Sequence, residues 1–239
     1  MTAGRFSIRP LYLQLRDALL DRIAAGEWRP GATIPNENDL AQEFGVSPGT
    51  VRKALDLLES ERVLTRRQGR GTFVNDQGSS ELAHRFSNIV TANDDRIVAY
   101  ATPGPIVEDS ASPLDCARLR LGPEAKVYRI RRVLFHARHP LMVEDARVPA
   151  DLFPGLPEQA EAAKSVALLA KQYGLLLGNA EERIAIGAAD KACADDLKLT
   201  AGSPILVLDR VVATLDGRAI EWRVGYCNPG NRHYVAKIG

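Results

Sequence analysis

Six consecutive residues, RRQGRG at positions 66–71, combine three arginines with two glycines. Guanidinium groups bind phosphates and base edges through paired hydrogen bonds, and glycine lets a backbone turn sharply or approach another molecule closely. The flanking runs 63–67 and 71–74 have the composition of short strands, so the pattern predicts a basic hairpin. Such a hairpin suits a sugar-phosphate backbone, with Arg70 entering a neighbouring minor groove. Its candidate nucleic-acid contacts are Arg66, Arg67, Gln68, Gly69, Arg70, Gly71 and Thr72.

A second group of candidate contacts precedes the hairpin, on a predicted helix that begins at Pro48. Four apolar residues of this helix have the spacing of one buried face: Val51, Ala54, Leu55 and Leu58. Arg52 and Lys53 then lie on the outer face near the helix N-terminus, where cations oppose the helix dipole. Phosphates or base edges would supply the missing negative partner, although a solvated charged face is the alternative. The candidate contacts in this region are Asn36, Asn38, Ser47, Gly49, Thr50, Arg52 and Lys53.

Two further helices are predicted to position these residues. The first, from Pro10 to Gly26, carries an apolar stripe at Leu11, Leu15, Leu19 and Ile23. The second is capped by Asn36, turns Leu40 and Phe44 inward and stops at Gly45. Ser47 and Pro48 then start the basic helix, and two helices joined by so short a turn form a helix-turn-helix.

A phosphate-binding glycine loop of a nucleotide enzyme is the alternative interpretation of the hairpin glycines. Glycines of that kind open a helix after a strand, whereas Gly69 and Gly71 connect two strands. The sequence context therefore favours the basic hairpin.

Bulk composition sets limits on the remaining functions. The chain has 31 Lys+Arg against 30 Asp+Glu, so any affinity for nucleic acid must come from local clusters. No apolar run is long enough to cross a bilayer and the first ten residues lack the apolar core of a signal peptide, which predicts a cytoplasmic protein without a membrane partner. Three widely spaced cysteines, Cys116, Cys193 and Cys227, indicate thiols in a reducing compartment.

The pattern changes after residue 75. Small and polar residues at 76–83 have the composition of a linker, so we expect one domain at 1–75 and another at 84–239. The second domain contains alternating β-branched and aromatic runs at 126–135, 140–149, 180–189, 203–214 and 218–227. Two helices, at 165–174 and at 190–199, interrupt these runs. We expect an α+β fold in which helices pack on an antiparallel sheet.

The first third of the chain resembles the winged helix-turn-helix of the GntR family of bacterial transcription regulators. The resemblance rests on the order of turn residues, on the helix spacing and on the segment RRQGRGTF. It implies a regulator, typically a repressor, that binds a palindromic double-stranded DNA operator as a homodimer and responds to a small effector. Asn38 and Pro48 replace basic residues that the family uses on DNA, which predicts a weaker salt dependence.

The second domain resembles the UTRA effector domain of the HutC-like branch of that family, whose fold is similar to chorismate lyase. The resemblance rests on RRVLFHARHPLMVEDARVPADLFPGL, on LVLDRVV and on GYCNPGNRHYVAKI. It implies an effector site on the sheet and a dimer interface in this domain.

Charged residues inside apolar strands are the candidate effector contacts, because such charges are costly without partners. Arg132, Glu144 and Glu221 occupy positions where the family commonly has Arg, Glu and Glu. The alternative is that Arg132 and Glu144 simply pair across adjacent strands. Further candidates, from the start of the domain and from its last strands, are His84, Arg85, Phe86, Ser87, Arg223, Tyr226 and Tyr234.

The chemistry of the effector is predicted from one position at which this chain differs from its relatives. Relatives that bind sugar phosphates commonly carry a second arginine two positions after the first, where this chain has Leu134. A single guanidinium binds a carboxylate bidentately, so we expect a small acidic metabolite.

A chorismate lyase-like enzyme joined to a DNA-binding module is the competing hypothesis for the second domain. Fold similarity alone does not establish an activity. The four histidines are scattered and no nucleophile motif or metal-ligand spacing is present, so we expect no catalytic residue, metal or cofactor. A scaffold that binds only protein would leave the arginines of the hairpin without a role.

Overall fold

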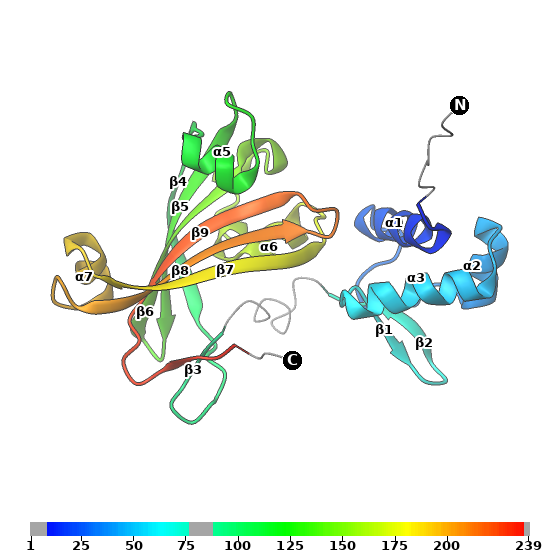
Figure 1. The fold of residues 1–239 in the computed structure, drawn as a ribbon, viewed down its shortest axis with the longest axis horizontal. Coiled ribbons are helices and arrows are strands. Elements are labelled where there is room, and N and C mark those ends of the chain that lie inside the picture. Colours follow the sequence, from blue (N-terminus) through cyan, green and yellow to red (C-terminus); the bar gives the residue numbers. More distant parts are fainter. Residues whose placement is uncertain (1–8, 77–87, 237–239) are drawn as a thin grey trace, which may run out of the picture. The chain divides into compact units, whose positions relative to one another are not determined.

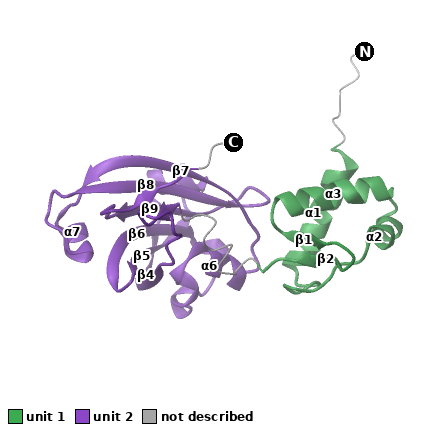
Figure 2. Cartoon of the chain, turned by 90° about the horizontal axis from the view of Figure 1, so that it is seen from below, with its two compact units in different colours: residues 1–77 green, residues 78–239 purple. Residues whose placement is uncertain are grey.

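The computed structural model describes residues 9–76 and 88–236 of the chain. The chain forms two compact units, Met1–Gln77 and Gly78–Gly239 (Figure 2). The expected contacts His84, Arg85, Phe86 and Ser87, and linker residues 77–83, lie outside the described residues.

The first unit contains three helices and a two-stranded hairpin (Figure 1). The helices are α1 (Leu11–Ala24), α2 (Glu37–Phe44) and α3 (Pro48–Ser60), and the antiparallel strands are β1 (Leu64–Arg67) and β2 (Gly71–Val74). The buried face of α3 is the predicted one, with Val51, Ala54, Leu55 and Leu58. One residue of the α1 stripe was assigned wrongly: Leu11 is 58% exposed, because it opens the helix before its apolar face meets α3.

The caps of α2 and α3 confirm the predicted turn. Asn36 accepts hydrogen bonds from the backbone amides of Asn38 and Asp39, and Gly45 ends α2 in the left-handed region at φ 62°. Ser47 accepts from the amide of Thr50, and Pro48 occupies the first helical position. These local interactions fix the short connection between α2 and α3.

The second unit is built on one antiparallel sheet of six strands in the order β4-β5-β6-β9-β8-β7. Its strands are β4 (Tyr100–Ser110), β5 (Lys126–His136), β6 (His139–Pro149), β7 (Leu177–Ala188), β8 (Pro204–Thr214) and β9 (Ala219–Cys227). The five predicted strand runs correspond to β5 to β9. The predicted α+β fold is confirmed in both units.

Besides its 3-10 helices, four elements of this unit were not predicted. Strand β4 contains Pro103 and Pro105 and lies at an edge of the sheet, where the missing amide donors cost no ladder hydrogen bond. The others are helix α5 (Pro113–Leu119) and the short strands β3 (Ile89–Val90) and β10 (His233–Tyr234), which pair with each other. Their brevity leaves no periodic signal in the sequence.

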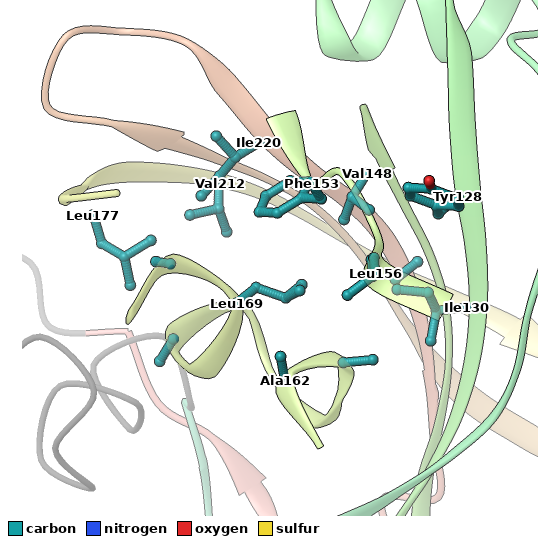
Figure 3. Close-up of a cluster of buried hydrophobic side chains, with 14 residues drawn as sticks. Tyr128, Ile130, Val148, Phe153, Leu156, Ala162, Leu169, Leu177, Val212 and Ile220 are labelled. Carbon is teal, nitrogen blue, oxygen red and sulfur yellow. The ribbon is translucent and has the colours of Figure 1, made fainter. Parts of the chain in front are cut away.

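Helices cover both faces of the sheet. Helix α5 contacts β9 and β6, and α7 (Lys191–Leu197) contacts β6 from the same side. The other face packs against the 3-10 helices η2 (Ala150–Leu152), η3 (Leu156–Glu158) and η4 (Ala162–Lys164) and against α6 (Val166–Gln172). Figure 3 shows the hydrophobic core on this face, in which Phe153, Leu156 and Leu169 contact strand residues such as Ile130 and Val212. The helical segment thereby closes over one end of the sheet face.

Over residues 9–76 and 88–236, none of the helices combines the length and the apolar character that a membrane span requires.

Close packing at a single glycine gives a test of this fold. A Cβ atom on Gly178 of β7 would lie 2.5 Å from the carbonyl oxygen of Thr214, which is a backbone atom and cannot move aside. We therefore expect Gly178→Ala to destabilise the second unit by about 1–3 kcal/mol through overpacking. Denaturant unfolding in a Trp28→Phe background leaves Trp222 as the reporter of this unit.

Gly122→Ala is the matched control, because no atom lies within 4 Å of its added Cβ. Equal unfolding midpoints for the two alanine variants would contradict the described packing of β7 against β8.

Candidate functional site

The hairpin tip of the first unit presents arginine and glycine to solvent. Gly69 and Gly71 both have positive φ, 68° and 110°, so the turn uses the left-handed region that favours glycine. The amide of Arg70 donates to the carbonyl oxygen of Arg67 at 2.9 Å, and Arg70 itself is exposed. The guanidinium of Arg67 lies 4.9 Å from the ring centre of Phe73. The tip is therefore an ordered, basic turn.

Arg66, predicted as a nucleic-acid contact, is paired with acidic residues within the first unit. Its guanidinium pairs with Asp56 and lies 3.5 Å from Glu59, both on α3. The strand alternation turns Arg66 toward α3 while Arg67 points to solvent. Arg66 therefore joins the hairpin to α3 in the free protein.

The outer face of α3 carries the other basic candidates. Arg52 is paired with Glu37 of α2 at 2.7 Å, although 64% of its side chain is exposed. The ammonium of Lys53 lies 6.0 Å from the ring centre of Tyr12. Thr50 exchanges a hydrogen bond with Ser47 at 2.9 Å. Exposed positions along this face include Ser47, Gly49, Arg52 and Lys53.

The two asparagines of α2 differ in how their side chains are used. Asn36 caps the helix through its carbonyl oxygen, and its amide donates to Asp39. Asn38 is exposed. Asn36 therefore fixes the start of α2, whereas the side chain of Asn38 faces solvent.

The second unit contains a cavity of about 620 Å³ on the sheet face that also carries α6. Strands β4, β5, β6, β8 and β9 supply its sheet side, and residues 164–168 at the start of α6 supply another wall. Ile89, Ile97, Leu134, Met142 and Leu208 form an apolar part of the lining. A volume of this size accommodates a small metabolite.

Three arginines and three glutamates form a buried charge network at this cavity: Arg132, Glu144, Glu182, Arg210, Glu221 and Arg223. Strand register brings them together, since Arg132 pairs with Glu144 and Arg210 lies between Glu182 and Arg223. The formal charges are balanced, which lowers the cost of burying them. We call these six residues the charge network.

Close contacts connect the members of the charge network. Arg132 Nη1 lies 2.8 Å from Glu221 Oε2 and 3.4 Å from Glu144 Oε2. Arg223 Nη1 lies 2.9 Å from Glu144 Oε1, while its Nη2 lies 3.5 Å from Glu182 Oε1. Arg210 Nη2 lies 2.8 Å from the same Glu182 oxygen. The six groups thus form one continuous cluster.

One donor of this cluster has no hydrogen-bond partner in the part of the chain that the structure describes. Arg132 is 1% exposed, and its Nε donates to the carbonyl oxygen of Ala163 at 2.5 Å. Its Nη2 is buried without a hydrogen-bond partner among the described residues. A buried guanidinium nitrogen without a hydrogen bond lowers the stability of the fold, and an acceptor in the adjoining cavity would supply that bond.

The charge network holds the carboxylate of Glu144 ionised. Burial opposes the charge on Glu144, but Arg223, Arg132 and Arg210 outweigh burial and hold its pKa below the ordinary value. Burial, together with repulsion from Arg223, lowers the pKa of Arg210. At neutral pH the cavity therefore offers both anionic acceptors and cationic donors.

Comparison with known proteins assigns both units. The model described as bacterial regulatory proteins of the gntR family matches residues 11–74, and the UTRA domain model matches residues 106–233. The chain belongs to the GntR family.

Individual GntR relatives match along nearly the whole chain. The HTH-type regulator YurK of Bacillus subtilis is 30% identical, over 93% of this chain and 90% of its own length. A probable fructoselysine utilization operon repressor of Escherichia coli K12 is 28% identical, over 93% and 92%. The crystal structure of PhnF from Mycobacterium smegmatis is 26% identical with a TM-score of 0.56, covering 94% of this chain and 99% of that one. The Bacillus subtilis and Escherichia coli relatives are named as transcription regulators, so this GntR protein is a DNA-binding transcription regulator rather than an enzyme.

The cavity of this GntR protein gathers most of the described effector candidates. Arg132, Glu144, Glu221, Arg223 and Tyr234 all line it. The pairing of Arg132 with Glu144, considered above as an alternative to ligand contact, is present in the cavity wall.

Tyr226 requires a correction. It lies three residues after Arg223, so the two side chains project from opposite faces of β9. Tyr226 packs against Val143 and the α7 cluster instead of facing the cavity.

Sequence reasoning missed Arg210, Glu182 and Asn88. Arg210 lies in the apolar run LVLDRVV and carries the same signal that identified Arg132, a charge inside a buried strand. Glu182 lies beside Glu181 in a run of mixed charge, so only the strand register distinguishes it. Asn88 follows the segment 77–87 and has no motif of its own.

Glu144→Gln tests the electrostatics of the cavity. At neutral pH the variant leaves Arg132 and Arg223 with one carboxylate fewer, and we expect a loss of about 3–5 kcal/mol in the second unit. Because the folded pKa of Glu144 lies below 4.5, its contribution is present above that pH and is lost as pH falls through the folded pKa. The difference between parent and variant should therefore shrink on acidification, as measured by denaturant unfolding between neutral pH and pH ~3.

Glu181→Gln on the same sheet is the control, because that side chain is 68% exposed and an exposed ion pair is worth little. A Glu144→Gln deficit that stayed constant down to acid pH would rule out an ionised Glu144 as its source.

Proposed function

We propose that this chain is a ligand-responsive repressor that binds a palindromic operator as a homodimer, with DNA affinity controlled by a small acidic metabolite. The assignment uses a DNA-binding domain at 1–75, a linker at 76–83 and an effector and dimerisation domain at 84–239, acting in the cytoplasm. The observation that carries it is the unpartnered Arg132 Nη2 in a cavity, within a chain that also folds into a winged helix-turn-helix. A cavity of this kind suits allosteric control of DNA binding.

Helix α3 is the proposed major-groove element. Its exposed N-terminal half carries Thr50, Arg52 and Lys53, and Arg52 reaches DNA by exchanging Glu37 for a phosphate or a base edge. Asn38 and the amides near Ser47 and Gly49 approach the adjoining backbone. Asn36 acts by capping α2.

The hairpin is the proposed minor-groove element. Gln68, Gly69, Arg70 and Gly71 form its exposed tip, with Arg67 and Thr72 beside them. Arg70 carries a charge that is free to enter a narrow minor groove. Arg66 contributes by holding the hairpin on α3 through Asp56.

A homodimer follows from the proposed palindrome. Each α3 reads one half-site, and half-sites one helical turn apart place the two recognition helices ~34 Å apart. Affinity is then sensitive to the separation of the helices. An effector need shift that affinity by only ~1–3 kcal/mol to regulate a promoter.

The charge network supports a singly charged effector. The sequence suggested that Arg132 acts alone on the effector. In the structure Arg210 and Arg223 also line the cavity. Three glutamates already balance these arginines, so a dianionic phosphate would bring more uncompensated charge than a carboxylate does. We propose a carboxylate at Arg132 Nη2, with hydroxyl or amine donors to Glu144 and Glu221 and an apolar part against Leu134.

Operator binding tests the DNA assignment. Selection of genomic fragments with purified protein should enrich a palindromic site. Arg52→Ala should weaken binding to this site by about 1–3 kcal/mol, because it removes a direct DNA contact. A gel shift at several salt concentrations measures the affinity and its salt slope.

Arg183→Ala removes an exposed arginine from β7 and serves as the charge-matched control. If Arg52→Ala bound the selected site as tightly as Arg183→Ala, α3 would not be the recognition helix.

Thermal shift tests the effector class. A panel of monocarboxylates, their phosphate analogues and neutral sugars is applied to the parent and to Leu134→Arg. Hydroxylated monocarboxylates should stabilise the parent most, whereas the second guanidinium of Leu134→Arg should raise the response to phosphates. Stabilisation of the parent by neutral or cationic compounds alone would reject an acidic effector.

A further inference from the structure

The beginning and the end of the described second unit are joined beside the cavity. Strand β10 pairs with β3, with Tyr234 opposite Ile89 and His233 opposite Val90. The amide of Val235 donates to the carbonyl oxygen of Asn88 at 2.8 Å. Asn88 is the first described residue after 77–87, the segment through which the chain continues from the DNA-binding unit. The position of Asn88 is therefore set partly by the C-terminal strand.

The phenol of Tyr234 connects this junction to the charge network. Its Oη donates to Glu182 Oε2 at 2.6 Å and accepts from Asn88 Nδ2 at 2.7 Å. The other oxygen of Glu182 contacts Arg210 and Arg223. A hydrogen bond to an ionised carboxylate is stronger than one between neutral groups. One hydroxyl thus links a buried carboxylate to the entry point of the domain.

The contacts continue from there to the unpartnered donor. Glu182 meets Arg223, Arg223 meets Glu144, and Glu144 meets Arg132. Arg223, Glu144 and Arg132 line the cavity, as do Asn88 and Tyr234. A group that binds at Arg132 or Arg223 therefore acts on the same cluster that holds Tyr234.

We infer that Tyr234 is the positioning residue through which occupancy of the cavity is transmitted to Asn88 and onward along the chain. The inference rests on the proposed function and adds the residue that performs the coupling. A carboxylate at Arg132 competes with Glu144, which lies 3.4 Å from that guanidinium. Glu144 then binds Arg223 more closely and draws it away from Glu182, which lies 3.5 Å from Arg223. Glu182 then retains Arg210 as its cation and accepts a stronger hydrogen bond from the phenol of Tyr234. The stronger bond changes the hydrogen bond that the phenol accepts from Asn88.

Continuity in space does not by itself carry coupling, so the hydroxyl must be tested apart from the ring. The ring of Tyr234 packs with the apolar cluster of Ile89, Ile97 and Leu141. Tyr234→Phe keeps this packing and removes only the Oη contacts. Tyr226→Phe makes the same chemical change on the opposite face of the sheet and is the matched control.

Hydrogen exchange of the free full-length protein gives the first readout. In Tyr234→Phe the amide of Val235 should exchange at least ~10-fold faster than in the parent, as expected for the loss of a hydrogen bond to a charged group. Amides of β5 and β6 should be unchanged, and Tyr226→Phe should match the parent at Val235. An unchanged rate at Val235 in Tyr234→Phe would show that the phenol does not position this junction.

The second readout uses the selected operator duplex as the probe, because coupling between two sites is reciprocal. Operator binding should change the exchange of residues 180–184, around Glu182, in the parent and in Tyr226→Phe. The change should be lost in Tyr234→Phe. Equal changes in all three proteins, or no change in a parent that binds the operator, would overturn the inference.

Failure of the proposed function has a different signature. Without an operator, no variant would show a DNA-dependent change, while the faster exchange at Val235 would still report the contact itself. We expect the parent and Tyr234→Phe to bind the operator equally. Operator binding should change the hydrogen exchange of residues 180–184 in the parent and leave it unchanged in Tyr234→Phe.

Discussion

The burial of six charges on one face of a sheet is the constraint on which the second unit depends. Three guanidiniums and three carboxylates lie on neighbouring strands, and each is tolerated there only because an opposite charge lies beside it. Register must therefore be held closely, since a slip of one residue would turn these groups to the other face and leave their partners unpaired. The same face carries the cavity, so its wall combines this charge network with apolar side chains such as Leu134 and Met142.

The first unit depends on local signals, and for that reason much of it was predictable. Asn36, Gly45, Ser47 and Pro48 each act within a few residues of their own position, so their roles are visible in the sequence. The second unit depends on pairing between distant strands. Arg132 and Glu144 were recognised as charges in apolar runs, but only the register places Glu182 among them and Tyr226 away from them. Strand β4 was missed because its prolines are acceptable at an edge and nowhere else in a sheet.

The contact between the two short strands beside the cavity also depends on residues that are distant in sequence. Asn88 and Tyr234 are 146 residues apart in sequence and meet through one hydroxyl. No periodicity or composition could indicate that contact, because Tyr234 belongs to a strand of two residues and Asn88 directly precedes another. The elements proposed to carry regulation are thus the ones that local sequence describes least, whereas the elements proposed to recognise DNA are described best.

The acidic partners of the basic surface have a consequence for how the protein finds its site. Glu37 holds Arg52, and Asp56 holds Arg66, so much of the positive charge is already neutralised in the free protein. A stretch of arbitrary duplex must displace these carboxylates before it gains a phosphate contact, and the exchange yields little net attraction. We therefore expect residence on random DNA to be short, so that the protein searches a genome mostly by brief encounters. A sequence that offers Arg52 a base edge as well as a phosphate would retain the protein longer.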